Sequence, residues 1–165
     1  MPDSQKISEK QSEYMNLIAE IMDIRKRGEK PVAYIRTYGC QQNVADSEKI
    51  KGMLEQSGFE FADEPDNADF ILFNTCAVRE HAEDRVFGNV GALKNLKRKH
   101  PQILIALCGC MMEQEHVANK IYKSFPFVGL VFGTHSLHHF PELMYNALLC
   151  LLYTSPSPRD YAASR

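Results

Sequence analysis

Short, nearly continuous apolar runs alternate with longer amphipathic stretches from Pro31 onward. The apolar runs predict strands at residues 32–37, 59–62, 69–74, 103–108 and 127–132. The amphipathic stretches predict helices at residues 44–57, 78–99, 112–123 and 136–149. Strands of this kind, alternating with helices, are typical of a parallel sheet with both faces covered. We therefore predict an α/β fold: a flavodoxin- or Rossmann-like open parallel sheet of about five strands with helices on both faces.

Residues 1–30 carry a different pattern, that of one amphipathic helix before the first strand. Its apolar positions recur at helical spacing and are Tyr14, Leu17, Ile18, Ile21 and Met22. Gly28 and Pro31 end the helix. We expect this N-terminal helical extension to dock on the domain formed by residues 31–149, or on a part of the protein outside this chain.

The final segment, residues 150–165, shows neither helical nor strand periodicity. It includes Ser155-Pro156-Ser157-Pro158, a composition that favours an extended, disordered segment. The segment also resembles the translation of sequencing-adaptor DNA at the broken end of a gene fragment. We therefore predict a disordered, non-native tail and exclude Cys150 from the candidate ligands.

Three cysteines stand just after predicted strands. Cys40 follows the first strand, Cys76 follows the strand at 69–74, and Cys110 follows the strand at 103–108. The strand order cannot be read directly from the sequence. The flavodoxin-like order 2-1-3-4-5 is one of two common choices, and it would make these strands neighbours, about 4.8 Å apart, with their carboxyl ends where such sheets bind ligands. Three converging thiolates can hold an iron–sulfur cluster. A cubane with three cysteine ligands leaves one iron open for a substrate or an exogenous sulfur atom.

Other interpretations of the cysteines remain open on this pattern. A structural zinc site usually has four ligands in closely spaced pairs, and only Cys108-Gly109-Cys110 is close here. The same pair could be a redox dithiol. Cys108, inside a predicted strand, is typical of a small buried hydrophobic residue.

Composition and charge narrow the classes of function. The 165 residues are 44% hydrophobic and 24% charged, as in a globular domain with its own core. A net charge of −2 gives the chain as a whole no electrostatic footprint for nucleic acid. The polar N-terminus lacks a signal-peptide core, and no apolar run approaches the roughly 20 residues of a membrane span. We therefore expect a cytoplasmic protein without membrane contact, whose clustered cysteines indicate metal binding or catalysis.

Four motifs near the strand ends are specific in combination. They are Tyr38-Gly39-Cys40-Gln41-Gln42-Asn43, Asn74-Thr75-Cys76-Ala77-Val78-Arg79-Glu80, Gly109-Cys110-Met111 and Val131-Phe132-Gly133-Thr134-His135. Over residues 32–149 the chain resembles the N-terminal domain of the radical-SAM methylthiotransferase family. Two departures leave the three cysteines in place: Gln42 stands where Met is usual, and Met112-Glu113-Gln114 replaces the commoner Ala-Gln.

The first motif points to one branch of that family. Its Cys-Gln-x-Asn pattern resembles the tRNA (MiaB-like) branch. The branch that modifies ribosomal protein S12 tends to carry Cys-Pro-Lys-Asn, and the threonylcarbamoyladenosine branch carries Cys-Lys-x-Asn. Both remain alternatives, as does a non-enzymatic flavodoxin-like interaction module that folds without iron.

The resemblance implies a cofactor for this domain. An auxiliary [4Fe-4S] cluster would be held by three thiolates, and its open iron would accept sulfur from a donor. The implied ligands are Cys40, Cys76 and Cys110, and the side chains that could brace them are Asn43, Asn74 and Arg79.

The rest of the implied reaction belongs to domains that this chain lacks. In a full-length parent, a central domain would bind a second [4Fe-4S] cluster and S-adenosylmethionine through Cys-x-x-x-Cys-x-x-Cys, a motif absent from this sequence. A C-terminal domain would bind tRNA, and the product would be 2-methylthio-N6-isopentenyladenosine next to the anticodon. We therefore predict a truncated fragment of a monomeric enzyme that binds a cluster but has no catalytic residues of its own.

Overall fold

Five strands form the centre of the computed structural model, which describes residues 2–76 and 82–154. The strands are β1 (Val32–Thr37), β2 (Glu60–Phe61), β3 (Phe70–Thr75), β4 (Leu104–Gly109) and β5 (Leu130–Phe132). The α-helices are α1 (Pro2–Lys26), α2 (Gln41–Gln56), α3 (Ala82–Lys99), α4 (Glu115–Ser124) and α5 (Phe140–Thr154). Three short 3-10 helices are η1 (Pro65–Asn67), η2 (Cys110–Glu113) and η3 (Thr134–His139).

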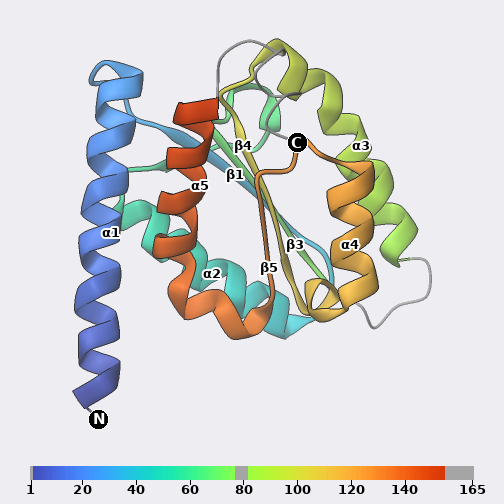
Figure 1. Cartoon of the computed structure of the whole chain (residues 1–165), viewed down its shortest axis with the longest axis horizontal. Helices are drawn as coiled ribbons and strands as arrows, with labels where there is room; N and C mark the ends of the chain where they lie inside the picture. The colour runs from blue at the N-terminus through green and yellow to red at the C-terminus, as the bar shows by residue number, and fades with distance from the viewer. Residues whose placement is uncertain (1, 77–81, 155–165) are drawn as a thin grey trace.

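The sheet is open, and every described pair of strands in it is parallel, in the order β2-β1-β3-β4-β5. Both the predicted fold class and the predicted order are therefore confirmed. At the carboxyl ends the register sets Thr37 beside Asn74 and Asn74 beside Cys108. Helices α1, α2 and α5 cover one face of the sheet, and α3 and α4 cover the other (Figure 1). No helix in the described part of the chain is long and apolar enough to cross a membrane.

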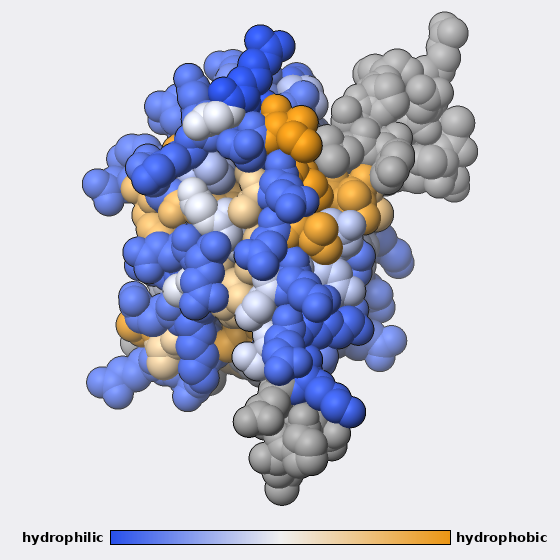
Figure 2. Space-filling view, turned by 90° about the vertical axis from the view of Figure 1, so that its left-hand side faces the viewer, coloured by the Kyte–Doolittle hydropathy of each residue, from blue (hydrophilic) through white to orange (hydrophobic). Residues whose placement is uncertain are grey.

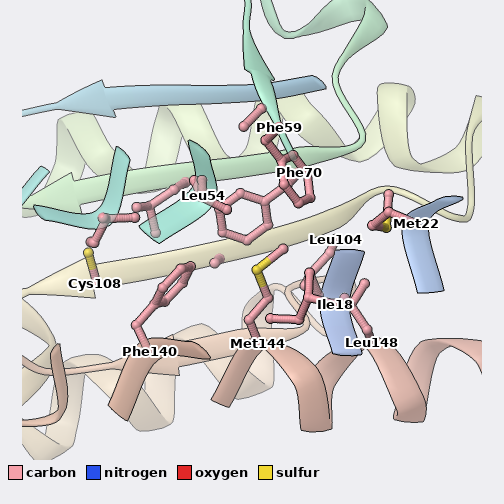
Figure 3. Close-up of a cluster of buried hydrophobic side chains, with 14 of the residues drawn as sticks. Ile18, Met22, Leu54, Phe59, Phe70, Leu104, Cys108, Phe140, Met144 and Leu148 are labelled. Atoms are coloured by element: carbon pink, nitrogen blue, oxygen red, sulfur yellow. The ribbon is translucent and has the colours of Figure 1, made fainter. Parts of the chain in front are cut away.

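Alternating side chains of the central strands feed two separate cores. Phe70 and Leu72 of β3 point to the α1, α2 and α5 side, whereas Ile71 and Phe73 point to the α3 and α4 side. Figure 3 shows the first of these cores, in which Cys108 lies among large apolar side chains. Because both faces are buried, β3 and β4 are apolar along most of their length, which is why the strand prediction succeeded.

The N-terminal helix packs against α5 and α2, so it docks on the domain itself. Its buried stripe differs from the predicted one. Met15, Ile18 and Met22 are buried, whereas Leu17 is 37% exposed. The outward side of α1 is largely hydrophilic, apart from an apolar patch near its upper end in Figure 2.

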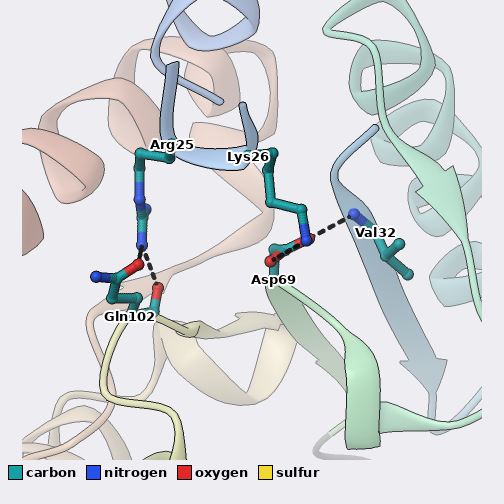
Figure 4. Close-up of polar contacts among 5 residues, drawn as sticks. All are labelled: Arg25, Lys26, Val32, Asp69 and Gln102. Carbon is teal, nitrogen blue, oxygen red and sulfur yellow. Dashed lines mark hydrogen bonds and ion pairs between the residues drawn. The ribbon is translucent and has the colours of Figure 1, made fainter. Parts of the chain in front are cut away.

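Polar contacts tie the end of α1 to the amino-terminal edge of the sheet (Figure 4). Lys26 forms an ion pair of 3.3 Å with Asp69, whose carboxylate also accepts a 2.8 Å hydrogen bond from the Val32 backbone. Arg25 donates to the backbone and side-chain oxygens of Gln102. The helix is thus anchored beside three strands, opposite the edge where the cysteines lie.

Lys97, in the last turn of α3, gives the first testable prediction. Its ammonium donates to the carbonyl oxygens of Pro101 and Ile103, both at 2.6 Å. Burial, and secondarily the charge of Arg25, lower the pKa of Lys97 from 10.5 to about 8. Between these pH values the unfolded chain binds more protons than the folded chain, so this group makes folding more favourable as pH rises.

The expected contribution is about 2 kcal/mol in the free energy of unfolding between pH 8 and 10.5, after a discount for partial exposure. In Lys97→Met, the free energy of unfolding measured with urea should no longer rise with pH in this way across this range. The matched control is Lys94→Met, an exposed lysine on the same helix. Equal pH dependence in the two variants would contradict the assignment.

Several element boundaries differ from the predicted ones. The helix predicted at 44–57 begins at Gln41, directly after Cys40. The helix predicted at 112–123 is divided into η2 and α4. The edge strands predicted at 59–62 and 127–132 are only two and three residues long. An edge strand pairs with a neighbouring strand on one side only, so fewer of its residues make the backbone hydrogen bonds that define a strand.

The C-terminal prediction was wrong in part. Helix α5 continues to Thr154, so residues 150–154 are helical rather than disordered. No Gly or Pro stands between Pro141, in the first turn of α5, and Pro156, and Pro156 restricts only the residue directly before it. Residues 155–165 lie outside the described part of the chain.

Candidate metal centre

The three candidate cysteines lie at one edge of the sheet. Cys40 follows β1, Cys76 directly follows β3, and Cys110 directly follows β4. Since β1, β3 and β4 are neighbouring parallel strands, their carboxyl ends meet at this edge. Cys150 lies near the end of α5, which runs back toward the opposite edge (Figure 1).

Gly39 brings Cys40 against Cys76. Its φ of +126° suits glycine, and a Cβ placed on it would stand 2.3 Å from the Cβ of Cys76. Backbone N–H groups of Asn43 and Gln42 at the start of α2 lower the pKa of the exposed Cys40 thiol, and a side-chain hydrogen bond with Cys76 contributes. Cys40 is the N-cap of α2, which places its thiol beside the N–H groups of the first helical turn.

Gly109 brings the third cysteine to the same place. Its φ is +111°, and a Cβ on it would lie 2.1 Å from the carbonyl oxygen of Thr75. The sulfur of Cys110, the next residue, lies 3.8 Å from that same oxygen. The Thr75 carbonyl is thus the common neighbour of Cys110 and, along the chain, of Cys76.

Two asparagines connect the start of α2 to the end of β3. The Asn43 Oδ1 atom lies 3.3 Å from both the backbone nitrogen and the sulfur of Cys40, and its Nδ2 donates to the Thr75 carbonyl at 2.9 Å. Asn43 also donates to Asn74 Oδ1 at 2.9 Å, and Asn74 donates back to the Asn43 carbonyl at 2.7 Å and to Ser47 at 2.9 Å. The structure therefore places both predicted bracing asparagines at the site. The third predicted residue, Arg79, lies outside the described residues.

Thr75, Ser47 and Thr37 were missed by the sequence interpretation. Ser47 Oγ lies 2.7 Å from Thr37 Oγ1, and Thr75 Oγ1 donates to the Cys108 carbonyl at 2.9 Å. The backbone carbonyl of Thr75 also contacts Asn43 and Cys110. Because every residue type has a backbone carbonyl, the sequence does not reveal this contact. Small hydroxyl residues beside the motifs were the only available signal.

Asn74 gives the second prediction. It is fully buried, and its amide makes three hydrogen bonds, so Asn74→Ala leaves Asn43 and Ser47 without these partners. The expected loss is about 3 kcal/mol in the free energy of unfolding, measured by urea titration. Asn95→Ala, at an exposed position of α3, should change it by less than about 0.5 kcal/mol. Similar losses in both variants would contradict a structural role for the Asn43–Asn74 pair.

Cys108 occupies a different environment from the other candidates. It is buried in the core beneath α2 and α5, and burial, followed by the charge of Asp46, raises the pKa of its thiol. Such a thiol stays protonated and packs as a small apolar side chain.

The donor set is chemically suited to an iron–sulfur cluster. Within the described residues, no three His, Cys, Asp or Glu side chains gather closely enough to hold a single metal ion. In a cubane each thiolate binds its own iron, so the sulfurs stand farther apart than around one ion. Three thiols, with N–H groups at the start of α2 beside Cys40, are donors of the kind that iron–sulfur clusters take.

A groove of about 830 Å³ extends from the Cys110 side of this edge. One wall is a stripe of α2 that includes Gln42, Asp46 and Lys49, and the other is η3 with His135 and His138. In the sequence these histidines could be taken for metal ligands, but Thr134 and Ser136 favour a solvated helix start.

Comparison with known proteins agrees with the motifs. The model of "Uncharacterized protein family UPF0004" matches residues 32–133. A relative from Caldicellulosiruptor saccharolyticus, named tRNA-2-methylthio-N(6)-dimethylallyladenosine synthase, is 54% identical over 123 residues, which are 74% of this chain and 26% of the relative. Proteins of the same name from Clostridium perfringens and Halalkalibacterium halodurans are 50% and 49% identical, over 77% and 81% of this chain and 28% and 24% of their own length.

The chain thus spans about a quarter of the length of the curated relatives it matches. The matched segment, residues 32–133, runs from the first strand to the turn after the last one and includes all three candidate cysteines. Because the family model covers more than half of the sequence, the chain belongs to family UPF0004, the N-terminal domain of methylthiotransferases.

Proposed function

We propose that this chain is the auxiliary-cluster domain of a tRNA methylthiotransferase. The full-length parent would add a methylthio group to C2 of N6-isopentenyladenosine next to the anticodon, with S-adenosylmethionine as a co-substrate. The observation that carries the proposal is the placement of Cys40, Cys76 and Cys110 at one sheet edge. A second observation supports the proposal: the chain is 54% and 50% identical in sequence to relatives that bear this enzyme's name.

In this proposal the three thiolates hold a [4Fe-4S] cluster. When bound, the cluster offers one iron without a protein ligand, which can bind the sulfur to be transferred. Helix α2 stabilises the Cys40 thiolate with its first N–H groups. The Asn43–Asn74 pair holds the start of α2 against the end of β3, and Gly39 and Gly109 allow the backbone to approach closely.

The remaining chemistry belongs to other parts of the parent. A second [4Fe-4S] cluster and S-adenosylmethionine would be held in a central domain, and tRNA would be bound mainly by a further domain. The chain alone binds its cluster without catalysis. The parent is proposed to act as a cytoplasmic monomer supplied by a sulfur donor.

A chimeric enzyme tests the proposal. The 123 residues of this chain that match the Caldicellulosiruptor relative would replace their counterpart in that protein, in cells that lack their own methylthiotransferases. Mass spectrometry of tRNA nucleosides should detect the methylthio product. The matched control carries Cys76→Ala and should give none. A folded, iron-containing chimera that leaves tRNA unmodified, or that modifies ribosomal protein S12 instead, would overturn the assignment.

A further inference from the structure

Glu113 connects two segments that are distant in the sequence. It ends η2, the short helix that begins with Cys110. Its Oε1 atom accepts a 3.1 Å hydrogen bond from the backbone N–H of His135 and a 3.3 Å hydrogen bond from the hydroxyl of Thr134. The carboxylate therefore holds the first turn of η3 against the segment that carries Cys110.

Gly133 provides the space for this contact. A Cβ on Gly133 would lie 2.0 Å from Glu113 Oε1 and 2.3 Å from its Cδ. The φ of −91° and ψ of 176° at Gly133 are accessible to any residue, so backbone conformation does not require glycine there. A side chain at residue 133 would need the volume that the Glu113 carboxylate fills, so the carboxylate would have to move.

The joined segments form one side of the groove beside the candidate ligands. Cys110 shares that lining with Thr134 and His135, the two residues that bind the Glu113 carboxylate. The other end of η2 is fixed by Gly109 against Thr75. Four residues are thus held at both ends, at Gly109 and at Glu113, with Cys110 between the two anchors.

We propose that Glu113 is a positioning residue for Cys110. By anchoring η2 to η3, its carboxylate fixes the third thiolate relative to Cys40 and Cys76. This inference rests on the proposed function, since it concerns one of the proposed cluster ligands. Side chains that brace metal ligands commonly contribute 10–100-fold to the affinity of a site.

Four variants of the chain distinguish the effect of the position of the Glu113 carboxylate from the effect of its charge. Glu113→Ala removes both hydrogen bonds, and Gly133→Ala leaves Glu113 intact but displaces its carboxylate. Glu113→Gln keeps an oxygen that accepts both bonds and loses the charge. The double variant Glu113→Ala/Gly133→Ala has room for the added methyl group, so it should behave as Glu113→Ala alone. Glu115→Ala, at an exposed acid on α4, is the matched control.

Each protein would be reconstituted anaerobically with iron and sulfide. The two readouts are the electron paramagnetic resonance spectrum of the reduced cluster and the rate at which a chelator removes iron. Iron should leave Glu113→Ala and Gly133→Ala about tenfold faster, with shifted g-values. Glu113→Gln and Glu115→Ala should resemble the unmodified chain.

The outcomes distinguish this inference from the proposed function. A cluster in the unmodified chain, with the same spectrum and release rate in every variant, would overturn the role of Glu113 alone. If Glu113→Gln behaved as Glu113→Ala does, charge rather than position would matter, which would also overturn it. Absence of a cluster from the unmodified chain would overturn the proposed function together with this inference.

Discussion

Gly109→Ala is expected to destabilise the domain by about 3–5 kcal/mol, through left-handed backbone strain together with overpacking. The added methyl group would lie 2.1 Å from the oxygen and 2.7 Å from the nitrogen of Thr75. Both are backbone atoms at the end of β3, a central strand, so they cannot move aside without disturbing the sheet. Urea unfolding followed by circular dichroism measures the loss.

A second glycine supplies the matched control for this substitution. Gly88 lies on α3, and a Cβ placed on it meets nothing within 4 Å. Gly88→Ala should therefore stabilise the domain by about 0.5–1 kcal/mol, because alanine favours helix and restricts the unfolded chain. If the two variants changed stability equally, the close approach of β4 to Thr75 would not be the cause.

The second large effect is the loss of the cluster from single cysteine variants. After anaerobic reconstitution, Cys40→Ala, Cys76→Ala and Cys110→Ala should each lose nearly all bound iron and the sulfide-to-iron absorbance. A cubane with only two remaining protein ligands is easily dismantled. Iron and sulfide analysis, with the visible spectrum, measures the effect.

Cys108→Ala is the control, two residues from Cys110 along the chain. Its thiol is buried in the apolar core and stays protonated, so its removal should preserve the iron content. The core would lose a small side chain at a cost of about 1 kcal/mol. A stable cluster in Cys110→Ala, or its loss in Cys108→Ala, would refute the proposed ligand set.

The architecture could be predicted because the central strands are buried on both faces. The runs that became β3 and β4 are apolar almost throughout and alternate with helices, a pattern typical of a parallel sheet covered on both sides. The strand order could not be read directly, because two orders are common in α/β sheets; the positions of the cysteines helped to choose 2-1-3-4-5.

The predicted helix boundaries and the predicted buried face of α1 were wrong where contacts with residues distant in the sequence determine the structure. Leu17 and Met15 both belong to apolar stripes of α1, and packing against α5 selected the stripe with Met15. At the break between η2 and α4, Glu113 accepts hydrogen bonds from Thr134 and His135, which lie 21 and 22 residues later in the chain. A glutamate at position 113 does not by itself indicate in the sequence that its carboxylate contacts η3.

Contacts made by the backbone were also beyond prediction. Thr75 matters at the site through its carbonyl oxygen, which Asn43 and Cys110 both contact. Gly133 matters because a carboxylate fills the place of its missing side chain. Neither role restricts the residue type in a way that one sequence reveals.

Mössbauer spectroscopy of the unmodified chain, reconstituted with ⁵⁷Fe and sulfide, tests the central claim most directly. The account predicts one [4Fe-4S] cluster per chain, with one of its four irons distinct from the rest and changing when a thiol or sulfide ligand is added. Four equivalent irons, a preference for a single zinc ion, or a folded chain that takes up no iron would contradict it.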